Sequence, residues 1–204
     1  MKKMLAFAAA FALCLSLAAC GGGDSSAADA GASAAQDSSA AQTSSAAQTS
    51  SAVQDEVNYL DYTFQFNVPE GFIEAQIEDL PEGASGLWQA EDGSNINVVI
   101  TPSDGSLASE VPGDELKAIM EQGYSAQLGQ EVTLENYSFE HTDIDGCPAY
   151  KMSYDVTVNG MTMTQYLVGV NGDMAYVFTF TDMTGNWAQA FADAIDSFTA
   201  VPLI

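Results

Sequence analysis

The sequence predicts an α+β domain in which helices pack against an antiparallel sheet, and three observations predict it. First, the dipeptides Asp145-Gly146, Asn159-Gly160 and Asn171-Gly172 separate apolar stretches, and these are the residue types that two-residue hairpin turns prefer. Second, apolar residues alternate along the stretches, as they do along a half-buried strand. Third, large apolar residues recur at helical spacing over 187–198.

The three turns predict a four-stranded antiparallel meander in the C-terminal half. Its strands are expected at residues 133–144, 147–158, 161–170 and 174–181. Each turn also fixes a register, because a slip of one residue would move the large apolar side chains to the other face. The predicted partners are His141 with Tyr150, Phe139 with Met152, Tyr137 with Tyr154 and, on the opposite face, Glu140 with Lys151; Val158 with Met161, Val156 with Met163 and Met152 with Leu167; Leu167 with Tyr176, Gln165 with Phe178 and Met163 with Phe180. The second face of this sheet is mixed in polarity, which favours a covering layer on each side.

Helices and further strands complete the expected order β, β, β, α, β, β, β, β, α. A helix is expected from near Pro112 and Asp114, and the closing helix follows the meander. Their inward residues are Leu116, Ile119, Met120 and Tyr124 in the first, and Trp187, Phe191, Ile195 and Phe198 in the second. The N-terminal half contributes a strand over 62–68 and two strands around the Asp92-Gly93 turn. The order is typical of helices against an antiparallel sheet.

At this level the chain resembles the PsbP/DcrB-like α/β sandwiches. The resemblance rests on the stretch from Tyr62 to Phe72, the mid-chain helix, the stretch from Asp145 to Tyr150, the meander and the closing helix with Trp187. It covers about residues 57–200 and implies a PsbP-like fold. It also implies an extracytoplasmic binding or accessory protein rather than an enzyme, and it carries over no catalytic residue.

The N-terminus has the three parts of a secretory signal. Lys2 and Lys3 precede an uncharged apolar stretch that is too short to span a bilayer comfortably. Leu17-Ala18-Ala19-Cys20 then resembles the lipobox of bacterial lipoproteins, whose cysteine carries the lipid. We therefore expect a signal peptide over 1–19, lipidation (palmitate among the acyl groups) at Cys20, and a location at the cell membrane on its extracytoplasmic side, in the cell envelope.

A tether and one domain are expected after Cys20. Residues 20–54 are rich in Ser, Ala, Gln and Thr, with a six-residue repeat from Ser38 onward. Such small polar residues bury too little apolar area to offset chain entropy, which predicts a flexible linker spanning roughly 30–35 Å. Residues 55–204 are expected to form a single globular α+β domain.

The charge is strongly acidic and excludes one class of partner. The chain has 28 acidic residues, four basic residues and a formal net charge of −24. All four basic residues are lysines, and only Lys117 and Lys151 lie in the domain. Such a surface repels nucleic acid and anionic headgroups, so we expect no nucleic-acid partner and membrane contact through the lipid alone.

No catalytic constellation is apparent in the sequence. His141 and Cys147 are the domain's single histidine and cysteine, but the predicted register places them on opposite faces of the sheet, with His141 as a half-buried rim residue. There is no Gly-x-Ser-x-Gly elbow, no phosphate-binding loop and no zinc ligand set. We therefore predict no enzyme activity, no catalytic residues and no cofactor.

Turn carboxylates leave a calcium alternative open. Asp143 and Asp145 lie in one turn and Glu91 and Asp92 in another, and hard cations prefer such oxygen ligands. Neither turn has EF-hand spacing. Three hypotheses therefore stand: a non-catalytic binding or accessory module with a protein or small-ligand partner, a Ca²⁺-responsive module, and a purely structural envelope lipoprotein.

Overall fold

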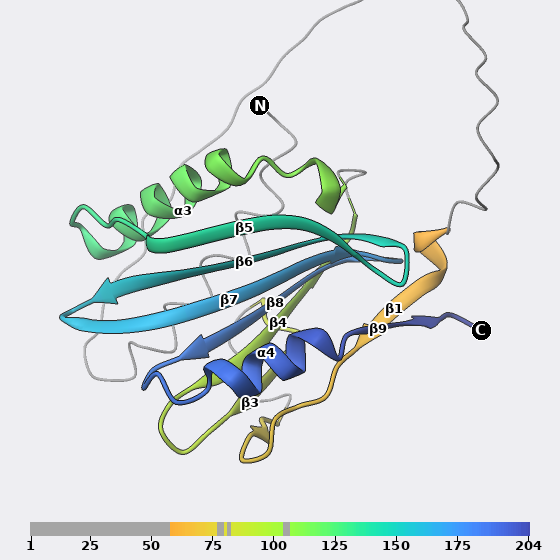
Figure 1. The fold of residues 1–204 in the computed structure, drawn as a ribbon, viewed down its shortest axis with the longest axis horizontal. Coiled ribbons are helices and arrows are strands. Elements are labelled where there is room, and N and C mark those ends of the chain that lie inside the picture. The colour runs from red at the N-terminus through yellow and green to blue at the C-terminus, as the bar shows by residue number, and fades with distance from the viewer. Residues whose placement is uncertain (1–57, 77–79, 81–82, 104–106) are drawn as a thin grey trace, which may run out of the picture.

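The computed structural model describes residues 58–76, 80, 83–103 and 107–204, and Figure 1 shows their arrangement. The elements in chain order are η2 (Tyr59–Asp61), β1 (Tyr62–Gln65), β2 (Ile73–Glu74), β3 (Gly86–Gln89), β4 (Asn95–Thr101), η4 (Ala108–Glu110), α3 (Gly113–Leu128), β5 (Glu135–Ile144), β6 (Cys147–Val158), β7 (Met161–Asn171), β8 (Ala175–Asp182), α4 (Ala188–Asp196) and β9 (Thr199–Pro202).

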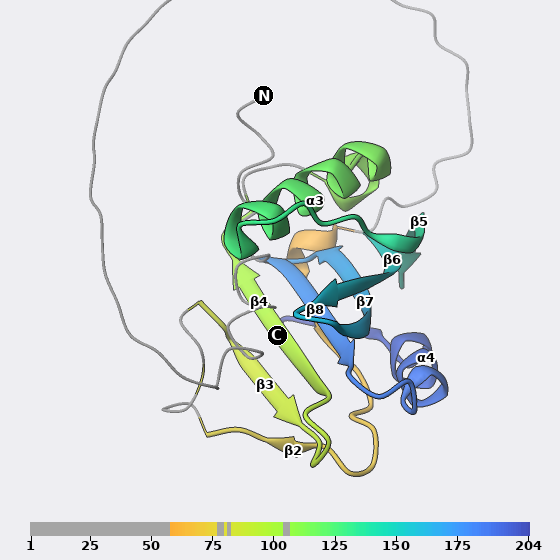
Figure 2. The same cartoon turned by 90° about the vertical axis from the view of Figure 1, so that its left-hand side faces the viewer.

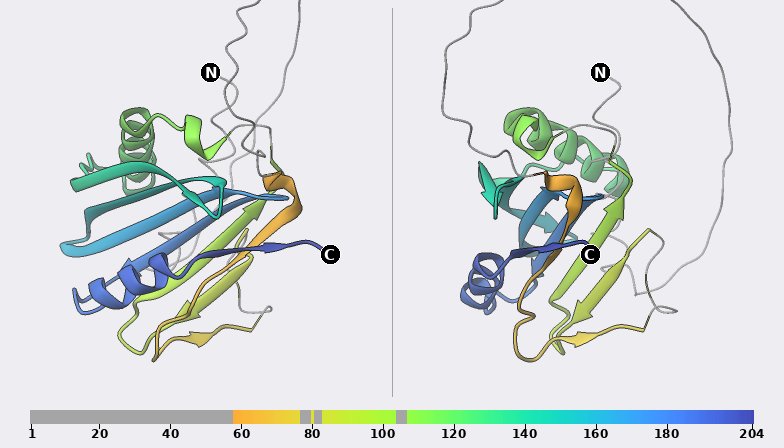
Figure 3. Two further views of the ribbon diagram at one scale, coloured as in Figure 1. Left: turned by 45° about the vertical axis from the view of Figure 1, so that its right-hand side comes forward. Right: turned by 90° about the vertical axis from the view of Figure 1, so that its right-hand side faces the viewer.

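A twisted antiparallel sheet forms the centre of the fold. Its seven strands run in the order β2-β3-β4-β8-β7-β6-β5, and β1 and β9 form a separate two-stranded ribbon. Helix α3 covers one face, whereas α4 and the ribbon cover the other (Figures 1 to 3). The predicted α+β class, with helices packed against an antiparallel sheet, is confirmed. No helix within the described residues is both long enough and apolar enough to cross a bilayer.

The first two hairpins have the predicted registers. His141 pairs with Tyr150, Phe139 with Met152 and Glu140 with Lys151, and the three predicted β6–β7 pairs are all present. Both residues of each turn have positive φ, from 52° at Asp145 to 87° at Gly146, as a type I′ turn requires. The pairing of Tyr137 with Tyr154 is wrong, because the ladder shifts between Glu135 and Ser138.

The predicted register of the third hairpin is also wrong, and the difference places the side chains of β8 on the opposite faces of the sheet. Leu167 pairs with Thr179 rather than with Tyr176, a shift of three residues. Neither Asn171 nor Gly172 has the positive φ of a type I′ turn, and Gly172 to Met174 form a longer loop between β7 and β8. Asn171 instead accepts a hydrogen bond from the main-chain N–H of Ala108.

The reversal of β8 divides the apolar side chains between two cores. The core beneath α3 contains Leu116, Met120 and Tyr124 with residues such as Met163 and Leu167. Phe178 and Phe180 lie in the other core, with Phe191 of α4. The sheet is therefore buried on both faces, and β8 is buried along its whole length.

The two helices lie where the periodicity of apolar residues predicts them, but the short strands β2 and β9 were not predicted. Helix α3 ends at Leu128 before Gly129, whose φ of 66° is a left-handed cap. No pattern in the sequence predicts β2 or β9. These strands have two and four residues, so their alternation is too brief to stand out from a loop.

Candidate functional site

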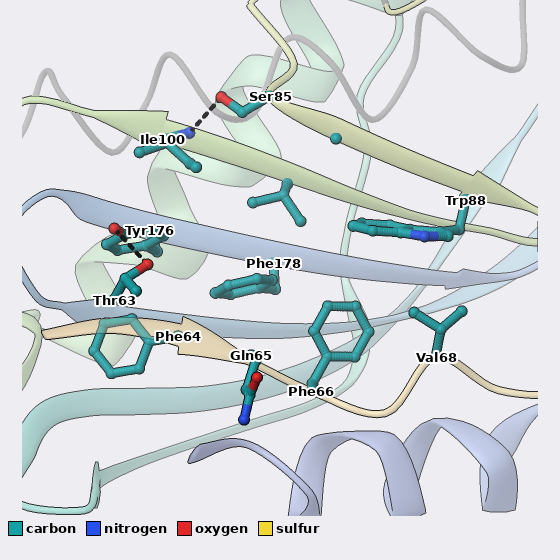
Figure 4. A pocket seen from close by; sticks show the side chains of 12 residues that line it. Thr63, Phe64, Gln65, Phe66, Val68, Ser85, Trp88, Ile100, Tyr176 and Phe178 are labelled. Atoms are coloured by element: carbon teal, nitrogen blue, oxygen red, sulfur yellow. Dashed lines mark hydrogen bonds between the residues drawn. The ribbon is translucent and has the colours of Figure 1, made fainter. Parts of the chain in front are cut away.

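An open groove with an aromatic floor lies beside β1 on the α4 side of the sheet. We call it the aromatic groove. Its volume is about 300 Å³, and its lining side chains come from β1, β3, β4, β8 and the segments next to them. Figure 4 shows Phe64 and Phe66 below Tyr176 and Phe178, with Trp88 and Ile100 on the strands beyond. The groove therefore joins segments more than 100 residues apart in the sequence.

Phe66 fixes the groove floor through ring contacts with four aromatic neighbours. Its ring lies edge-on to Trp88 at 5.6 Å, to Phe178 at 5.7 Å and to Phe180 at 5.6 Å. It also stacks on Phe198 at 5.1 Å. Such pairs add about 0.5–1.5 kcal/mol each beyond their area burial. The floor is consequently preformed and needs little ordering when an apolar group binds.

Four polar side chains contribute to the lining of the groove: Thr63, Gln65, Ser85 and Tyr176. The Tyr176 hydroxyl lies 3.1 Å from Thr63 Oγ1 and hydrogen-bonds the Asp173 carboxylate. Burial and the hydrogen bond to Asp173 raise the pKa of Tyr176 to about 12. The Ser85 hydroxyl accepts a hydrogen bond from the main-chain N–H of Ile100 (3.2 Å). The hydroxyl groups of Thr63, Ser85 and Tyr176 are therefore already engaged in hydrogen bonds within the protein.

The chemistry of the groove suits binding rather than catalysis. Its lining residues, as far as the structure describes them, carry no carboxylate, amine, imidazole or thiol. General acid–base and nucleophilic mechanisms need such groups within hydrogen-bond reach of a substrate. The lining resembles that of ligand sites, which are concave and mostly apolar with a few polar groups.

The predicted separation of His141 and Cys147 is confirmed by the register. His141 pairs with Tyr150 on the α3 side, whereas Cys147 belongs to the α4-side core. His141 is exposed rather than half-buried, and its Nε2–H donates to the Val111 carbonyl (2.8 Å). Burial, with nearby Asp145 and Asp143, raises the pKa of Cys147 to about 11. The thiol is therefore a packed core group and not a thiolate nucleophile.

The carboxylates proposed for calcium are held by the protein's own donors in three of four cases. Asp143 accepts from the N–H of Gly146 (3.0 Å), and Asp145 accepts from the N–H of Ala200 (2.8 Å). Asp92 accepts from the Trp187 indole (2.8 Å). Burial raises the pKa of Asp92, but the hydrogen bond from Trp187 and those from Ser94 and Thr184 outweigh burial and lower the pKa overall.

The fourth residue, Glu91, is exposed. Among the described residues, no three His, Cys, Asp or Glu side chains gather as a metal site would require. The calcium hypothesis stays a prediction. Cys20 and the tether boundaries lie outside the described residues, so these also stay predictions.

A second hollow of about 290 Å³ lies between α4 and strands β5 to β7. An ion pair crosses it, in which Lys151 Nζ lies 3.2 Å from Asp196 Oδ1. Glu140, the predicted partner of Lys151 across the two strands, also lines it. The ion pair links α4 to β6 across this hollow.

Sequence reasoning missed a buried polar residue on the α3 face. Asn97 is only 2% exposed, and its side-chain oxygen and nitrogen both lack a hydrogen-bond partner within the described structure. It lies opposite Leu87 on β3 and Thr179 on β8. Nearby, Gln165 is satisfied by Tyr124 (3.1 Å) and Thr181 (3.2 Å). Asn95 Oδ1 is the other buried side-chain atom without a partner among the described residues, and Asn97 stands out because both of its polar atoms are in this state.

The aromatic groove was also not predicted from the sequence. The alternation of Tyr62, Phe64, Phe66 and Val68 was the available signal. It predicts a strand with one apolar face, but it does not say which part of the sheet that face will cover. The groove arises because β1 covers β8 and leaves Trp88 and Ile100 only partly covered.

Comparisons with known proteins agree with this fold. One solved structure, the cyanobacterial PsbP protein CyanoP from Synechocystis sp. PCC 6803, is 17% identical with a TM-score of 0.52, over 76% of this chain and 98% of that one. LpqN, described as involved in cell envelope biogenesis of Mycobacterium tuberculosis, is 14% identical with a TM-score of 0.38, over 69% and 84%. At these identities the likeness to CyanoP shows the fold alone.

The family assignment comes from the sequence. A search of the curated proteins gave no match. The family model for PsbP, however, matches residues 51–200. This span includes all but the last two residues of β9, and with it both helices, the whole seven-stranded sheet and the aromatic groove. The chain belongs to the PsbP family.

Proposed function

We propose that this protein is a membrane-anchored lipoprotein on the extracytoplasmic side of the cell membrane, acylated at Cys20, whose domain is a non-catalytic accessory module. The domain binds an apolar part of its partner in the aromatic groove. The observation that carries the proposal is the groove itself, which is open, preformed and without a carboxylate, amine, imidazole or thiol among its described lining residues. Tethered by residues 20–54, the domain reaches partners near its anchor without inserting in the bilayer.

The exposed apolar residues of the groove support binding. Ile100 is 36% exposed and Val68 is 37% exposed, and both line the groove. Covering such surface contributes roughly 25 cal/mol per Å². Because the ring contacts of Phe66 already fix the floor, little of this gain is lost to ordering the site.

Placing a charged side chain in the groove should weaken the binding of a neutral apolar probe. We expect Nile red to bind the chain from residue 20 onward, made soluble by Cys20→Ser. Ile100→Lys should weaken that binding about tenfold or more, since it places a charge against apolar surface at a cost of about 1.4 kcal/mol or more. The measurement is a fluorescence titration. The matched control is Met161→Lys, because Met161 is 49% exposed and lies outside the groove lining. Equal Nile red affinities for the two variants would contradict the proposal.

The anchor is tested by labelling cells with an alkyne analogue of palmitate. The full-length protein should carry the label and sediment with membranes. Cys20→Ser should lose the label and leave the membrane fraction, because the acidic domain itself is repelled by anionic headgroups. Cys147→Ser serves as the control and should stay labelled. Retention of the label in Cys20→Ser would show that Cys20 is not the anchor.

A further inference from the structure

The ribbon of β1 and β9 has one open edge. In an antiparallel pair, every second residue turns its N–H and C=O away from the partner strand. Ala200 of β9 is such a residue, because its N–H donates outward to Asp145 (2.8 Å). Its partner Phe64 is therefore the outward-facing residue of β1. The bond from Leu203 N–H to the Asp61 carbonyl (2.7 Å) agrees, because it places residue 61 in the inward-facing set.

Part of this outward edge is already used as a hydrogen-bonding edge. Tyr62, which precedes Phe64 in the outward-facing set, accepts a bond from the N–H of Asp173 (2.9 Å). Beyond that point, no described residue is recorded as bonding to the outward N–H and C=O of Phe64. An unpaired edge of this kind is a template for an additional strand.

The open edge of β1 borders the aromatic groove. Phe64 lies on β1, and Tyr176 and Phe178 lie on the next strand seen in Figure 4, with Ile100 and Trp88 beyond them. Strands in one layer are about 4.8 Å apart, and packed layers are about 10 Å apart. A strand added beside β1 would therefore lie over the groove and place alternate side chains against its floor. It would extend the two-stranded ribbon, which covers this face only in part.

Carboxylates flank both ends of the groove. At the Tyr62 end, the Asp173 carboxylate accepts a hydrogen bond from the Tyr176 hydroxyl, and the Asp173 main-chain N–H donates to the Tyr62 carbonyl. At the other end Glu74 is paired with Trp88 and is exposed; directly paired residues share a face of the sheet. The domain's two lysines are engaged elsewhere: Lys117 pairs with Glu121 and Lys151 pairs with Asp196. The electrostatic complement of this site is a segment with a cationic residue on each side of apolar ones.

We infer that the open edge of β1 takes an extended, cationic segment of a partner protein as an added strand, with its alternate apolar side chains in the aromatic groove. This inference rests on the proposed function, because it names the partner of the same groove. Main-chain hydrogen bonds to Phe64 supply affinity, and the groove and its flanking carboxylates supply selectivity.

The test uses the probe peptide acetyl-KVTITVK-amide and the soluble chain from residue 20 onward, and isothermal titration calorimetry measures the binding. Two further peptides carry N-methyl groups, one on its second and fourth residues and the other on its third and fifth. Alternate N–H groups of a strand point to opposite edges, so one isomer loses the bonds to β1 and the other keeps them. We expect one isomer to bind at least tenfold more weakly than the unmodified peptide and the other to bind about equally.

Two controls separate this inference from the proposed function. Ile100→Lys should abolish peptide binding while Met161→Lys leaves it unchanged, and acetyl-EVTITVE-amide should bind at least tenfold more weakly. Equal binding of both N-methyl isomers would overturn the added strand, and equal binding of the acidic peptide would overturn the cationic partner. If Nile red binds in the groove and the unmodified peptide does not bind, the inference is wrong and the proposed function stands.

Discussion

Gly169→Ala should lower the free energy of unfolding by about 2–3 kcal/mol, toward the upper end of the range of about 1–3 kcal/mol that is typical of overpacked cores. Gly169 of β7 lies directly opposite Tyr150 of β6. A Cβ atom at this position would lie 2.2 Å from Tyr150 Cε1 and 2.3 Å from Cζ. Tyr150 is 2% exposed and stacks on Phe139 at 5.4 Å. The ring therefore cannot move aside without disturbing the core beneath α3.

Chemical denaturation followed by far-UV circular dichroism measures this effect. The double variant Gly169→Ala/Tyr150→Ala is the control, because truncating Tyr150 removes the ring that the new methyl group meets. In that background the added methyl should cost less than about 1 kcal/mol, which gives a clear coupling free energy. A wild-type stability for Gly169→Ala alone would mean that β6 and β7 are less tightly packed than the structure shows.

Asn97→Leu should raise the free energy of unfolding by about 1–3 kcal/mol. Each buried polar group without a partner carries a desolvation penalty of that size, and both polar atoms of the Asn97 side chain are in this state. Leucine has a similar volume and removes the penalty while adding apolar contact with Leu87. The expected result is a melting temperature several degrees above that of the wild-type chain.

Gln165→Leu is the matched control and should act in the opposite direction. Gln165 is fully buried and holds hydrogen bonds with Tyr124, Tyr154 and Thr181. Removing its amide leaves those hydroxyl groups without this partner, so the free energy of unfolding should fall by about 1–3 kcal/mol. If Asn97→Leu also lowered the stability, its amide would have a partner in solution, such as ordered water.

The hairpin registers show where local sequence was sufficient. Asp145-Gly146 and Asn159-Gly160 both adopt the backbone that their residue types favour, so the pairs next to these turns follow from the turns alone. The bulge near Asn136 limited this success, because Asn136 itself has a φ of 49° and no nearby signal marks it. Local turn chemistry fixes a register only as far as the strand stays regular.

Asn171-Gly172 shows how tertiary contacts override the same signal. The Asn171 side chain holds the main chain at Ala108. A Cβ at Gly172 would lie 2.3 Å from the Tyr62 carbonyl, so this glycine serves the close approach of β1 and not a tight turn. Both partners are distant in the sequence. The resulting three-residue shift moved Phe178 and Phe180 to the face that carries the groove.

The sequence by itself determined the α+β class, the two helices, two of the three hairpin registers and the separation of His141 from Cys147. These features depend on periodicity and turn chemistry within short stretches of chain. The lipidation of Cys20 is predicted in the same local way. Only the tertiary structure decided the pairing of β1 with β9, the reversed faces of β8 and the aromatic groove. Each of these features depends on which of several distant segments covers a given apolar surface. Because the hydrophobic effect is not directional, a local sequence pattern does not specify which segment that will be.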